Sequence, residues 1–318
     1  MNKEDLKIVF LGTPDFAVES LARLHDNGYN IVGVVTMPDK PAGRGHKMFE
    51  SPVKLYAKEH GLNVMQPEKL KDPEFVESLR ALNADLFIVI AFRMLPEIVW
   101  GMPRLGTFNL HASLLPKYRG AAPINWAVIN GDTATGVTTF FLKHEIDTGD
   151  IIRQEKIEIL PEDNVGSVHD KLMHLGAELT LDTVEHIIAG DLQPIPQDSL
   201  IGGDEPTPAP KIFKDTCRID WNKSAKEIHN LVRGLSPYPG AWTMLPSGSM
   251  KILETAIEQP TELSRAATPG AITIEGTRMW VHTGDGILEI SRLQPQGKKA
   301  MATADFLRGA RIADACFE

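Results

Sequence analysis

Two polar residues interrupt a strand-like apolar run near the middle of the chain, in the stretch FNLHASLLPKYRGAAPINWAVING from Phe108 to Gly131. Asn109 and His111 are two positions apart, so in a strand their side chains would point to the same face. Catalytic groups of parallel sheets belong at the C-terminal strand ends, where this pair would lie. An amide that donates and an imidazole that donates or exchanges protons could stabilise the oxyanion formed when a nucleophile attacks a carbonyl.

A group that handles the proton of such a reaction is supplied by the later stretch IDTGD, which contains Asp147 and Asp150. An aspartate beside Thr and Gly is typical of a turn. Near a strand-end histidine, however, it could orient the imidazole or relay its proton. The residue types alone do not choose between the two aspartates.

Other kinds of chemistry find little support. Ser113 lacks the context of a nucleophile elbow, Cys217 and Cys316 stand in unrelated contexts, and no cluster has metal-ligand spacing. Gly12 follows a strand-like run but lacks the further glycines of a dinucleotide fingerprint, so a tight strand-to-helix turn is the better interpretation. We therefore expect no metal, and direct transfer between two bound substrates in which proximity contributes strongly.

The elements that must position these residues alternate along the first half of the chain. Near-continuous apolar runs separated by amphipathic stretches indicate a largely parallel sheet covered on both faces. The predicted strands are residues 6–12, 30–36, 84–92, 106–113 and 136–142, and the predicted helices are 16–28, 51–61, 75–83 and 165–190. A helix at 224–235 and short β-like runs at 250–258, 269–276, 278–284 and 286–294 suggest a small barrel or sandwich.

Composition divides the chain in the same way. Residues 1–205 carry 19 basic and 30 acidic side chains, whereas residues 206–318 carry 14 and 12. A segment rich in Pro, Gly and acidic residues separates the halves, so we predict domains at 1–190 and 211–318 with a linker at 191–210. The mildly basic second half is compatible with a polyanionic partner. Two cysteines and an N-terminus without a signal-peptide core favour the cytoplasm and no membrane association.

The stretch from Phe108 to Gly131, together with IDTGDI, resembles the folate-dependent formyltransferase family, whose members transfer a formyl group from 10-formyltetrahydrofolate to an amine. The resemblance implies that Asn109, His111 and Asp147 form the catalytic trio, and only through it is Asp147 preferred to Asp150. It also implies a Rossmann-like α/β fold with a mostly parallel sheet and helices on both faces.

The resemblance extends to the folate site. It implies that the turn after His111 contacts the folate, through Ser113, Leu114, Leu115 and Pro116. The stretch FIVIAFRMLP is similar to the strand and loop that line the pterin pocket in the family, which implies contacts from Ile90, Phe92 and Arg93. Arg93 and Glu145 each stand where the family commonly has a small residue or glycine, and so affect the expected details of the pocket.

The acceptor substrate is indicated outside this core. The loop TMPDKPAGRGHKMFESPVK is similar to that of family members that formylate the initiator methionyl-tRNA for translation initiation. Its lysines and arginine, Lys40, Arg44 and Lys47, offer charge for phosphate groups. The stretches KIFKDTCRIDWNKSAKEIHNLVRGLSPYPGAWT and LQPQGKKAMATADFLRG resemble the family's C-terminal domain, which implies a smaller OB-like β-barrel that contacts tRNA. We expect the chain to act as a monomer.

Three alternatives remain open. The same catalytic residues could formylate a small amine, such as a glycinamide nucleotide or an amino sugar, or could hydrolyse formyl-folate with water in place of the amine. The chain could also be an RNA-binding protein without catalytic activity. The PAGRG loop and the second domain argue against the first two, and the intact trio argues against the third.

Overall fold

The computed structural model describes residues 2–42, 47–202, 206–246, 248–257, 268–310, 312 and 316–318. The chain forms two compact units. The N-terminal unit contains Met1–Gly120, Gly136–Ile157 and His169–Pro208, and the C-terminal unit contains Ala121–Thr135, Glu158–Val168 and Ala209–Glu318. Two early segments are thus grouped with the last third of the chain, and the domain limits drawn from composition stay a prediction.

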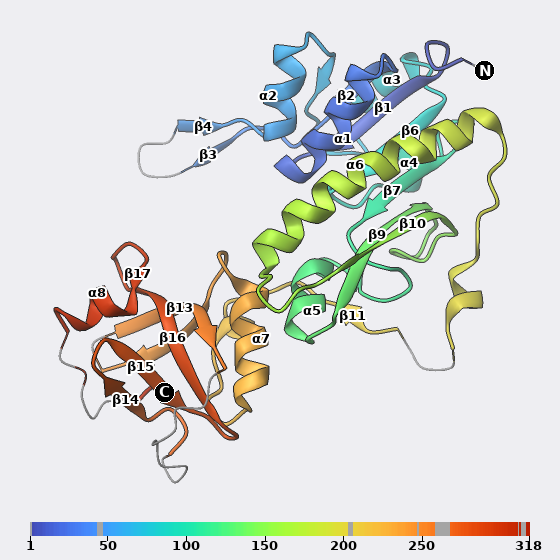
Figure 1. Cartoon of the computed structure of the whole chain (residues 1–318). Coiled ribbons are helices and arrows are strands. Elements are labelled where there is room, and N and C mark those ends of the chain that lie inside the picture. Colours follow the sequence, from blue (N-terminus) through green and yellow to red (C-terminus); the bar gives the residue numbers. More distant parts are fainter. Residues whose placement is uncertain are drawn as a thin grey trace. The chain divides into compact units, whose positions relative to one another are not determined.

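A seven-stranded sheet forms the centre of the N-terminal unit (Figure 1). Its strand order is β10-β9-β7-β6-β1-β2-β5. The strands are β1 (Lys7–Gly12), β2 (Asn30–Val35), β5 (Val64–Met65), β6 (Leu86–Ile90), β7 (Thr107–His111), β9 (Ala134–Phe141) and β10 (Ile151–Glu158). The five strands from β5 to β7 pair in parallel, and β9 is antiparallel to β7. The expectation of a mostly parallel sheet is confirmed.

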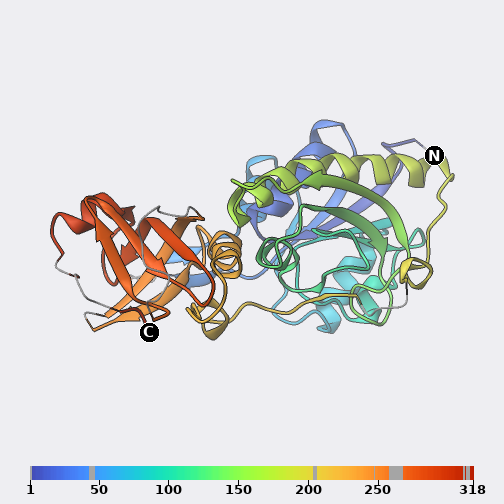
Figure 2. The ribbon, with the colours of Figure 1, turned by 60° about the horizontal axis from the view of Figure 1, so that its bottom comes forward.

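Helices cover both faces of this sheet, as the near-continuous apolar strands require. In Figures 1 and 2, α1 (Asp15–Asp26) and α6 (Val165–Ala189) lie across one face. The close packing of α6 shows at Gly176, where an added Cβ would lie 2.7 Å from Leu110. On the other face α3 (Pro73–Ala81) and α4 (Glu97–Trp100) bury apolar side chains against β1 and β6. The remaining helix of this unit is α2 (Pro52–Glu59).

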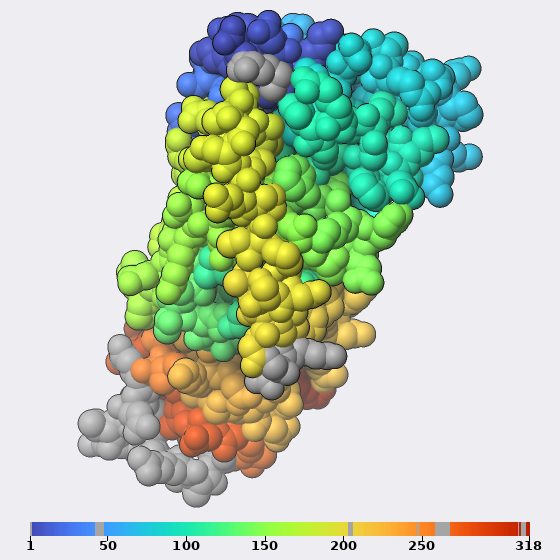
Figure 3. Space-filling view, turned by 90° about the vertical axis from the view of Figure 1, so that its right-hand side faces the viewer, coloured from blue at the N-terminus to red at the C-terminus, as the bar shows by residue number. Residues whose placement is uncertain are grey.

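Shorter elements complete the N-terminal unit. A two-stranded hairpin is formed by β3 (Lys40–Ala42) and β4 (Lys47–Phe49). Strand β8 (Arg119–Gly120) follows the turn after β7, β11 (Pro208–Ala209) stands at the end of the unit, and the 3₁₀ helix η1 (Gln197–Leu200) interrupts the segment after α6. That segment, yellow in Figure 3, lies on the surface of the unit.

The C-terminal unit is built on an antiparallel sheet in the order β12-β13-β16-β15-β14, with β17 paired to β16. Its strands are β12 (Ala241–Leu245), β13 (Gly248–Ala256), β14 (Ile272–Glu275), β15 (Arg278–His282), β16 (Ile287–Pro295) and β17 (Met301–Ala302). Register shifts between β13 and β16 interrupt the ladder, which bends a sheet. The expected fold class, an α/β domain followed by a smaller β domain, is therefore confirmed.

Helices close the core of the C-terminal unit. These are α5 (Pro123–Ile129), α7 (Ala225–Leu235) and α8 (Thr303–Leu307), with the 3₁₀ helix η2 (Asp215–Cys217). Helix α7 begins at a capping box in which Ser224 and Glu227 bond each other's backbone N–H groups. Helix α5 packs against α7 so closely that a Cβ on Gly234 would lie 2.5 Å from Ile129. This contact explains why residues 121–135 belong to this unit.

The topology defines where a substrate can reach the N-terminal sheet. The strand order reverses at β1, with β2 on one side and β6 on the other, and ligands of such sheets bind beyond the carboxyl ends of the strands. Strands β6 and β7 are neighbours, with Val89 opposite Asn109 and Ile90 opposite Leu110. The segments that follow them therefore leave the sheet at the same edge. Within the described part of the chain, no helix combines the length and apolar character needed to cross a membrane.

Candidate active site

Asn109 and His111 lie on β7, at the edge of the sheet where the topology directs a substrate. The intervening Leu110 packs towards Gly176 of α6, so the two polar side chains point to the opposite face. His111 is 7% exposed, and its ring lies edge-on to Phe140 of the adjacent β9, with 6.4 Å between centroids. The strand thus presents an amide and an imidazole side by side, as their spacing predicts.

The imidazole of His111 has a protein group next to each ring nitrogen. Nε2 lies 2.8 Å from the carbonyl oxygen of Tyr118. A carbonyl oxygen only accepts, so this contact assigns a hydrogen to Nε2. Nδ1 lies 3.9 Å from Oδ2 of Asp147, and both side chains are nearly buried. The carboxylate therefore faces the ring nitrogen opposite the one that bonds the Tyr118 carbonyl.

Asp147 lies in a tight turn between β9 and β10. Its backbone has φ +55°, the left-handed region that few non-glycine residues adopt. Its carboxylate Oδ2 accepts a hydrogen bond of 2.9 Å from the backbone N–H of Gly120. At position 149, two residues after Asp147, only glycine fits, because a Cβ on Gly149 would lie 1.5 Å from the carbonyl oxygen of Phe141. The turn is therefore fixed by backbone contacts on both sides of the carboxylate.

The rival aspartate faces elsewhere. Asp150 accepts a hydrogen bond of 2.7 Å from Nζ of Lys143, in a partly exposed ion pair. Of the two candidates, Asp147 is the one whose carboxylate pairs with His111. The geometry thus places Asp147, and not Asp150, opposite His111, while the catalytic role of Asp147 stays a prediction.

The side-chain amide of Asn109 is incompletely hydrogen-bonded. Its Oδ1 is buried without a hydrogen-bond partner, and the described residues offer its side chain no other bond. An unsatisfied buried amide costs on the order of 1–3 kcal/mol, so natural proteins rarely keep one without a use. Oδ1 is an acceptor, so the partner that it lacks is a donor, whereas the Nδ2 group of the same amide can donate to a carbonyl oxygen that becomes charged during a reaction.

The turn after His111 contains the first group of predicted folate contacts. Ser113 is fully buried, and its Oγ donates to the carbonyl oxygen of Lys117 at 2.7 Å. Leu115 is buried against Phe140 and Ile151. Leu114 and Pro116 are partly exposed. Side chains in this turn thus divide into an anchored pair and a pair that a ligand can reach.

The segment after β6 contains the second group. Ile90 is fully buried in the sheet, and Phe92 packs at the edge of the core beneath α3 and α4. The guanidinium of Arg93 donates to the backbone carbonyls of Pro67 and Glu68. Burial lowers its pKa, and its buried Nε has no hydrogen-bond partner. Arg93 therefore ties the loop after β6 to the segment before α3.

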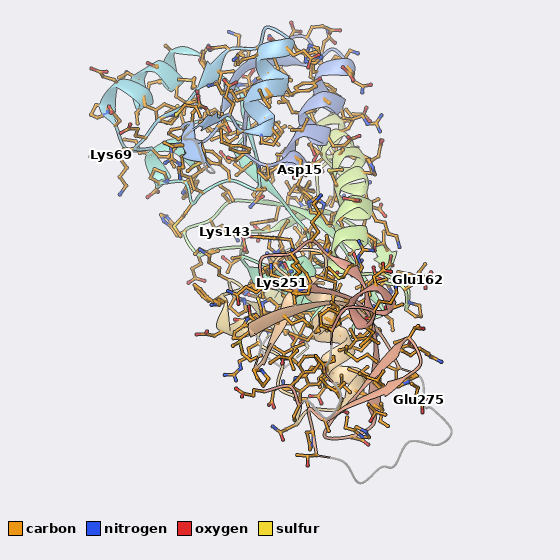
Figure 4. The ribbon with its side chains drawn as sticks, turned by 90° about the vertical axis from the view of Figure 1, so that its left-hand side faces the viewer. Asp15, Lys69, Lys143, Glu162, Lys251 and Glu275 are labelled. Carbon is orange, nitrogen blue, oxygen red and sulfur yellow. The ribbon has the colours of Figure 1, made fainter. Side chains whose placement is uncertain are left out.

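A pocket of about 720 Å³ opens beside this loop, lined by residues 69–71 and 94–98. Lys69, which points away from the ribbon in Figure 4, and Lys71 give its lining two positive charges, and Glu97 gives it one negative charge. Met94 and Ile98 are 72% and 53% exposed and give it an apolar wall. None of the three residues of the trio lines this pocket. The pocket therefore does not contain the reactive groups.

Two of the three basic residues predicted to contact tRNA belong to the β3–β4 hairpin. Lys40 is exposed at the start of β3, and Lys47 is the first residue of β4. Arg44 lies outside the described residues. The base of the hairpin is held by Lys54, which forms ion pairs with Asp39 and Glu50.

Four further residues of the site escape prediction from the sequence. Tyr118 and Gly120 supply the backbone groups that bond His111 and Asp147. Their only signal is an irregular Lys-Tyr-Arg-Gly sequence directly after a proline. Arg119 and Gln197 bond one another beside the Asp147 turn, and a glutamine in a proline-rich segment carries no sequence signal at all. Among the residues that the structure describes, no three His, Cys, Asp or Glu side chains form a group that could hold a metal ion.

Comparison with known families identifies two matching regions. Residues 6–184 match the model of formyl transferase, and residues 211–311 match the model of the formyl transferase C-terminal domain. Together they cover most of the chain, including β7 and the Asp147 turn.

Two relatives match along nearly their whole length. The chain is 60% identical over 319 residues to the methionyl-tRNA formyltransferase of Phocaeicola vulgatus, covering 99% of this chain and 98% of that protein. It is 57% identical over 318 residues to the methionyl-tRNA formyltransferase of Bacteroides fragilis, with the same coverage.

Solved structures share the fold at low identity. An N-formyltransferase from Helicobacter canadensis, in complex with folinic acid and dTDP-3-aminofucose, superposes with a TM-score of 0.66 at 20% identity, covering 90% of this chain and 98% of that one. HypX from Aquifex aeolicus, in complex with tetrahydrofolic acid, superposes with a TM-score of 0.63 at 19% identity, covering 94% of this chain and 46% of that one.

Proposed function

Because the chain belongs to the formyl transferase family, we propose that it transfers the formyl group of 10-formyltetrahydrofolate to the α-amino group of methionyl-tRNA. The observation that carries this proposal is the unpaired amide of Asn109, two residues from a histidine that faces an aspartate. The choice of acceptor is supported by relatives named methionyl-tRNA formyltransferase at 57% and 60% identity. The product is formylmethionyl-tRNA, used in translation initiation, and the reaction takes place in the cytoplasm.

The reaction requires one bond to form and one to break. The neutral amine of the methionyl group attacks the formyl carbon, whose carbonyl oxygen gains negative charge. The bond from that carbon to N10 of the folate then breaks, the amine loses a proton and N10 gains one. The protein therefore has to stabilise the negatively charged formyl oxygen and move one proton over a short distance.

Asn109 is the group that meets the oxyanion. Its Nδ2 group donates to the formyl oxygen, and the buried Oδ1, which has no hydrogen-bond partner, remains as an acceptor for a second ligand group. His111 donates through Nε2 to the Tyr118 carbonyl. Its imidazole, held there beside the amide, exchanges a proton as the amine and N10 change charge.

Asp147 orients the imidazole of His111. Its carboxylate lies 3.9 Å from Nδ1 and is itself held by the Gly120 N–H. Loss of its negative charge would weaken the attraction that holds the ring in this orientation. Asp147 thus acts on the reaction through His111.

The folate binds where the two predicted segments leave the sheet, at the carboxyl ends of β6 and β7. Leu114, Pro116 and Phe92 offer partly exposed apolar surface for its ring system, while Ser113, Leu115, Ile90 and Arg93 hold the two segments in place. The pocket beside the loop, with Lys69 and Lys71 in its lining, is suited to the negatively charged glutamyl tail.

The C-terminal unit offers a surface on which the tRNA can bind. A groove of about 610 Å³ is lined by aromatic and basic side chains without an acidic one, among them Phe213, Lys214, Arg218, Tyr238, Trp242 and Lys251. Phe213 and Tyr238 are 62% and 80% exposed, although large apolar groups are costly to leave in water. Lys214 and Arg218 both lie over the Trp242 ring, at 5.5 and 5.7 Å from its centroid. Interleaved aromatic rings and cations are typical of surfaces that stack bases and bind phosphates.

The proposed tRNA contacts also include Arg44 and, on the hairpin of the N-terminal unit, Lys47 and the exposed Lys40. We assign to these residues the grip on the acceptor end, because phosphate contacts position a nucleic acid without reading its sequence.

The test is to incubate the protein with 10-formyltetrahydrofolate and methionyl-tRNA, using initiator and elongator species in parallel and an amino sugar nucleotide as a small amine. We expect formylmethionine on initiator tRNA and little product with the other two acceptors. Formylation of the small amine alone, or release of formate without transfer, would refute the proposed acceptor.

A further inference from the structure

Gln197 is buried in a segment that is otherwise exposed. Its side chain is 1% exposed at the start of η1, whereas Asp198 and Ser199 next to it are exposed and Leu200 is 49% exposed. Residue Ile195 fixes the approach of this segment through two backbone hydrogen bonds of 2.8 Å with Ile151 of β10. The segment therefore brings one polar side chain into the unit at a defined position.

All the hydrogen-bonding capacity of that side chain is used beside the active site. Nε2 of Gln197 donates to the carbonyl oxygens of Asp147 and Gly149, at 2.9 and 2.8 Å. Its Oε1 accepts from Nε and Nη2 of Arg119, at 3.0 and 2.8 Å. Few side chains combine two amide donors with an acceptor, and asparagine is one methylene shorter.

These bonds join the two segments that hold the His111–Asp147 pair. One segment is the turn in which Asp147 has φ +55°, a backbone conformation that costs about 1–3 kcal/mol and persists only where the surroundings impose it. The other contains Arg119 between Tyr118, whose carbonyl bonds His111, and Gly120, whose N–H bonds the Asp147 carboxylate. Gln197 bridges the two segments from outside.

We infer that Gln197 is a positioning residue, which keeps the Asp147 carboxylate opposite Nδ1 of His111 by bonding the backbone of the Asp147 turn and the guanidinium of Arg119. For its effect on catalysis this inference rests on the proposed function, but its effect on His111 does not. Gln197 touches neither substrate nor reacting atoms, so its loss should change the proton chemistry and leave substrate affinity intact.

The decisive variant is Gln197→Met, which keeps the length of the side chain and removes all four hydrogen bonds. We expect kcat to fall about 10–10²-fold, as for a misplacement of roughly 1 Å at a reacting group, with the KM values for folate and tRNA within about two-fold of wild type. Gln193→Met is the matched control, because Gln193 is exposed in the same segment. It should behave as wild type.

A second variant keeps the test valid if the first folds poorly. Gln197→Glu retains an acceptor for Arg119, which should hold the segment in place, but sets a carboxylate oxygen against two carbonyl oxygens. It should lose at least as much kcat as Gln197→Met. In the Asp147→Asn background, either substitution at Gln197 should cost less than about two-fold further, because the group that it positions has already lost its charge. A full additional loss in that background would indicate a structural role and overturn the inference.

A measurement without substrates separates this inference from the proposed function. The surroundings of His111 can be followed at one fixed pH by NMR with histidine labelled at Cε1, using His111→Gln to assign the signal. We expect the chemical shift of this signal in Gln197→Met to move in the same direction as in Asp147→Asn, and that in Gln193→Met to stay at the wild-type value. A folded Gln197→Met protein with the wild-type chemical shift would overturn the inference, whether or not the chain formylates methionyl-tRNA.

Discussion

The two polar regions of the molecule are built in opposite ways. Around Asn109, His111 and Asp147, the side chains are largely buried and the partners are mostly backbone groups, so each reacting atom has one position. In the groove of the C-terminal unit, Phe213 and Tyr238 are exposed, and Lys214 and Arg218 lie over the Trp242 ring. The active-site region therefore depends on the positions of individual atoms, whereas the groove depends on the presence of aromatic and basic side chains.

This difference separates the two tasks of a tRNA-modifying transferase. Stabilising a transition state requires donors that are fixed before the reaction begins, and an error of about 1 Å costs roughly 10²-fold in rate. Binding a polyanion requires charge and stacking surface, which tolerate small displacements. Substitutions in the first region should therefore lower kcat, and substitutions in the second should raise the KM for tRNA and change its salt dependence.

The largest expected effect distinguishes two aspartates three residues apart. Asp147→Asn should lower kcat by about 10²–10⁴-fold, the range for loss of proton handling, because the charge opposite His111 is removed. Asp150→Asn, which only breaks the exposed pair with Lys143, should stay within about two-fold of wild type. Steady-state kinetics with both substrates varied would measure this. A loss in Asp150→Asn equal to that in Asp147→Asn would refute the assignment.

Next in size is the loss of a stacking surface in the groove. Tyr238→Ala should weaken tRNA binding by about 1–3 kcal/mol, the usual contribution of one base–aromatic stack, with kcat at saturating tRNA unchanged. Tyr238 is 80% exposed, so the substitution should leave stability intact. Tyr238→Phe keeps the ring and should bind nearly as well as wild type. Fluorescence titration with unacylated tRNA would measure the affinities, and equal affinity for Tyr238→Ala would rule the groove out as a stacking site.

A smaller effect is expected from one cation of the groove. Arg218→Ala should reduce the slope of log K against log salt concentration by about 0.7–0.9, the value for one phosphate contact. Lys226→Ala provides a control, because Lys226 is exposed on α7 and does not line the groove. Filter binding between 50 and 200 mM salt, a range in which such contacts are measurable, would show whether the slopes differ. Identical slopes for both variants and wild type would place the phosphates elsewhere.

The smallest expected effect is on the pH dependence of stability, and it involves two histidines of the C-terminal unit. Burial, and then the nearby Arg233, lowers the pKa of His229, and burial lowers that of His282. The unfolded chain therefore binds these protons more readily, so stability is fully present above about pH 6.5 and is lost as the pH falls below it. Each histidine contributes a slope of at most about 1.4 kcal/mol per pH unit. Thermal unfolding from pH 7.5 to 5 should show a shallower decline in His229→Gln. An unchanged decline would exclude His229 as its source.

The sequence specifies the two regions to different degrees. The strands and helices of the N-terminal unit follow from apolar periodicity, and the shared face of Asn109 and His111 follows from their spacing on β7. The choice of Asp147 over Asp150 does not follow, because it depends on a left-handed residue and on the close approach of Gly149 to Phe141. Gln197 could not be anticipated, since its partners are 48 to 78 residues away in the chain.

For the C-terminal unit, too, the sequence predicts the elements but not how they come together. Its helix and strands were predictable from pattern, but the grouping of residues 121–135 with it depends on the packing of α5 against Gly234 of α7. The groove joins residues of η2, of the turn after α7 and of β12 and β13, which share no motif in the sequence. Surfaces of this kind become recognisable only when the fold places their charges and rings together.

The measurement that tests the account most directly is the single-turnover rate of formyl transfer from 10-formyltetrahydrofolate to initiator methionyl-tRNA, for the wild type and Asn109→Ala side by side. We predict formylmethionyl-tRNA from the wild type and a rate about 10²–10³-fold lower for Asn109→Ala, the cost of one oxyanion donor, with folate affinity unchanged. Equal rates for the two proteins would contradict the role of the unpaired amide. Release of free formate by the wild type, with no formylated tRNA, would contradict the function itself.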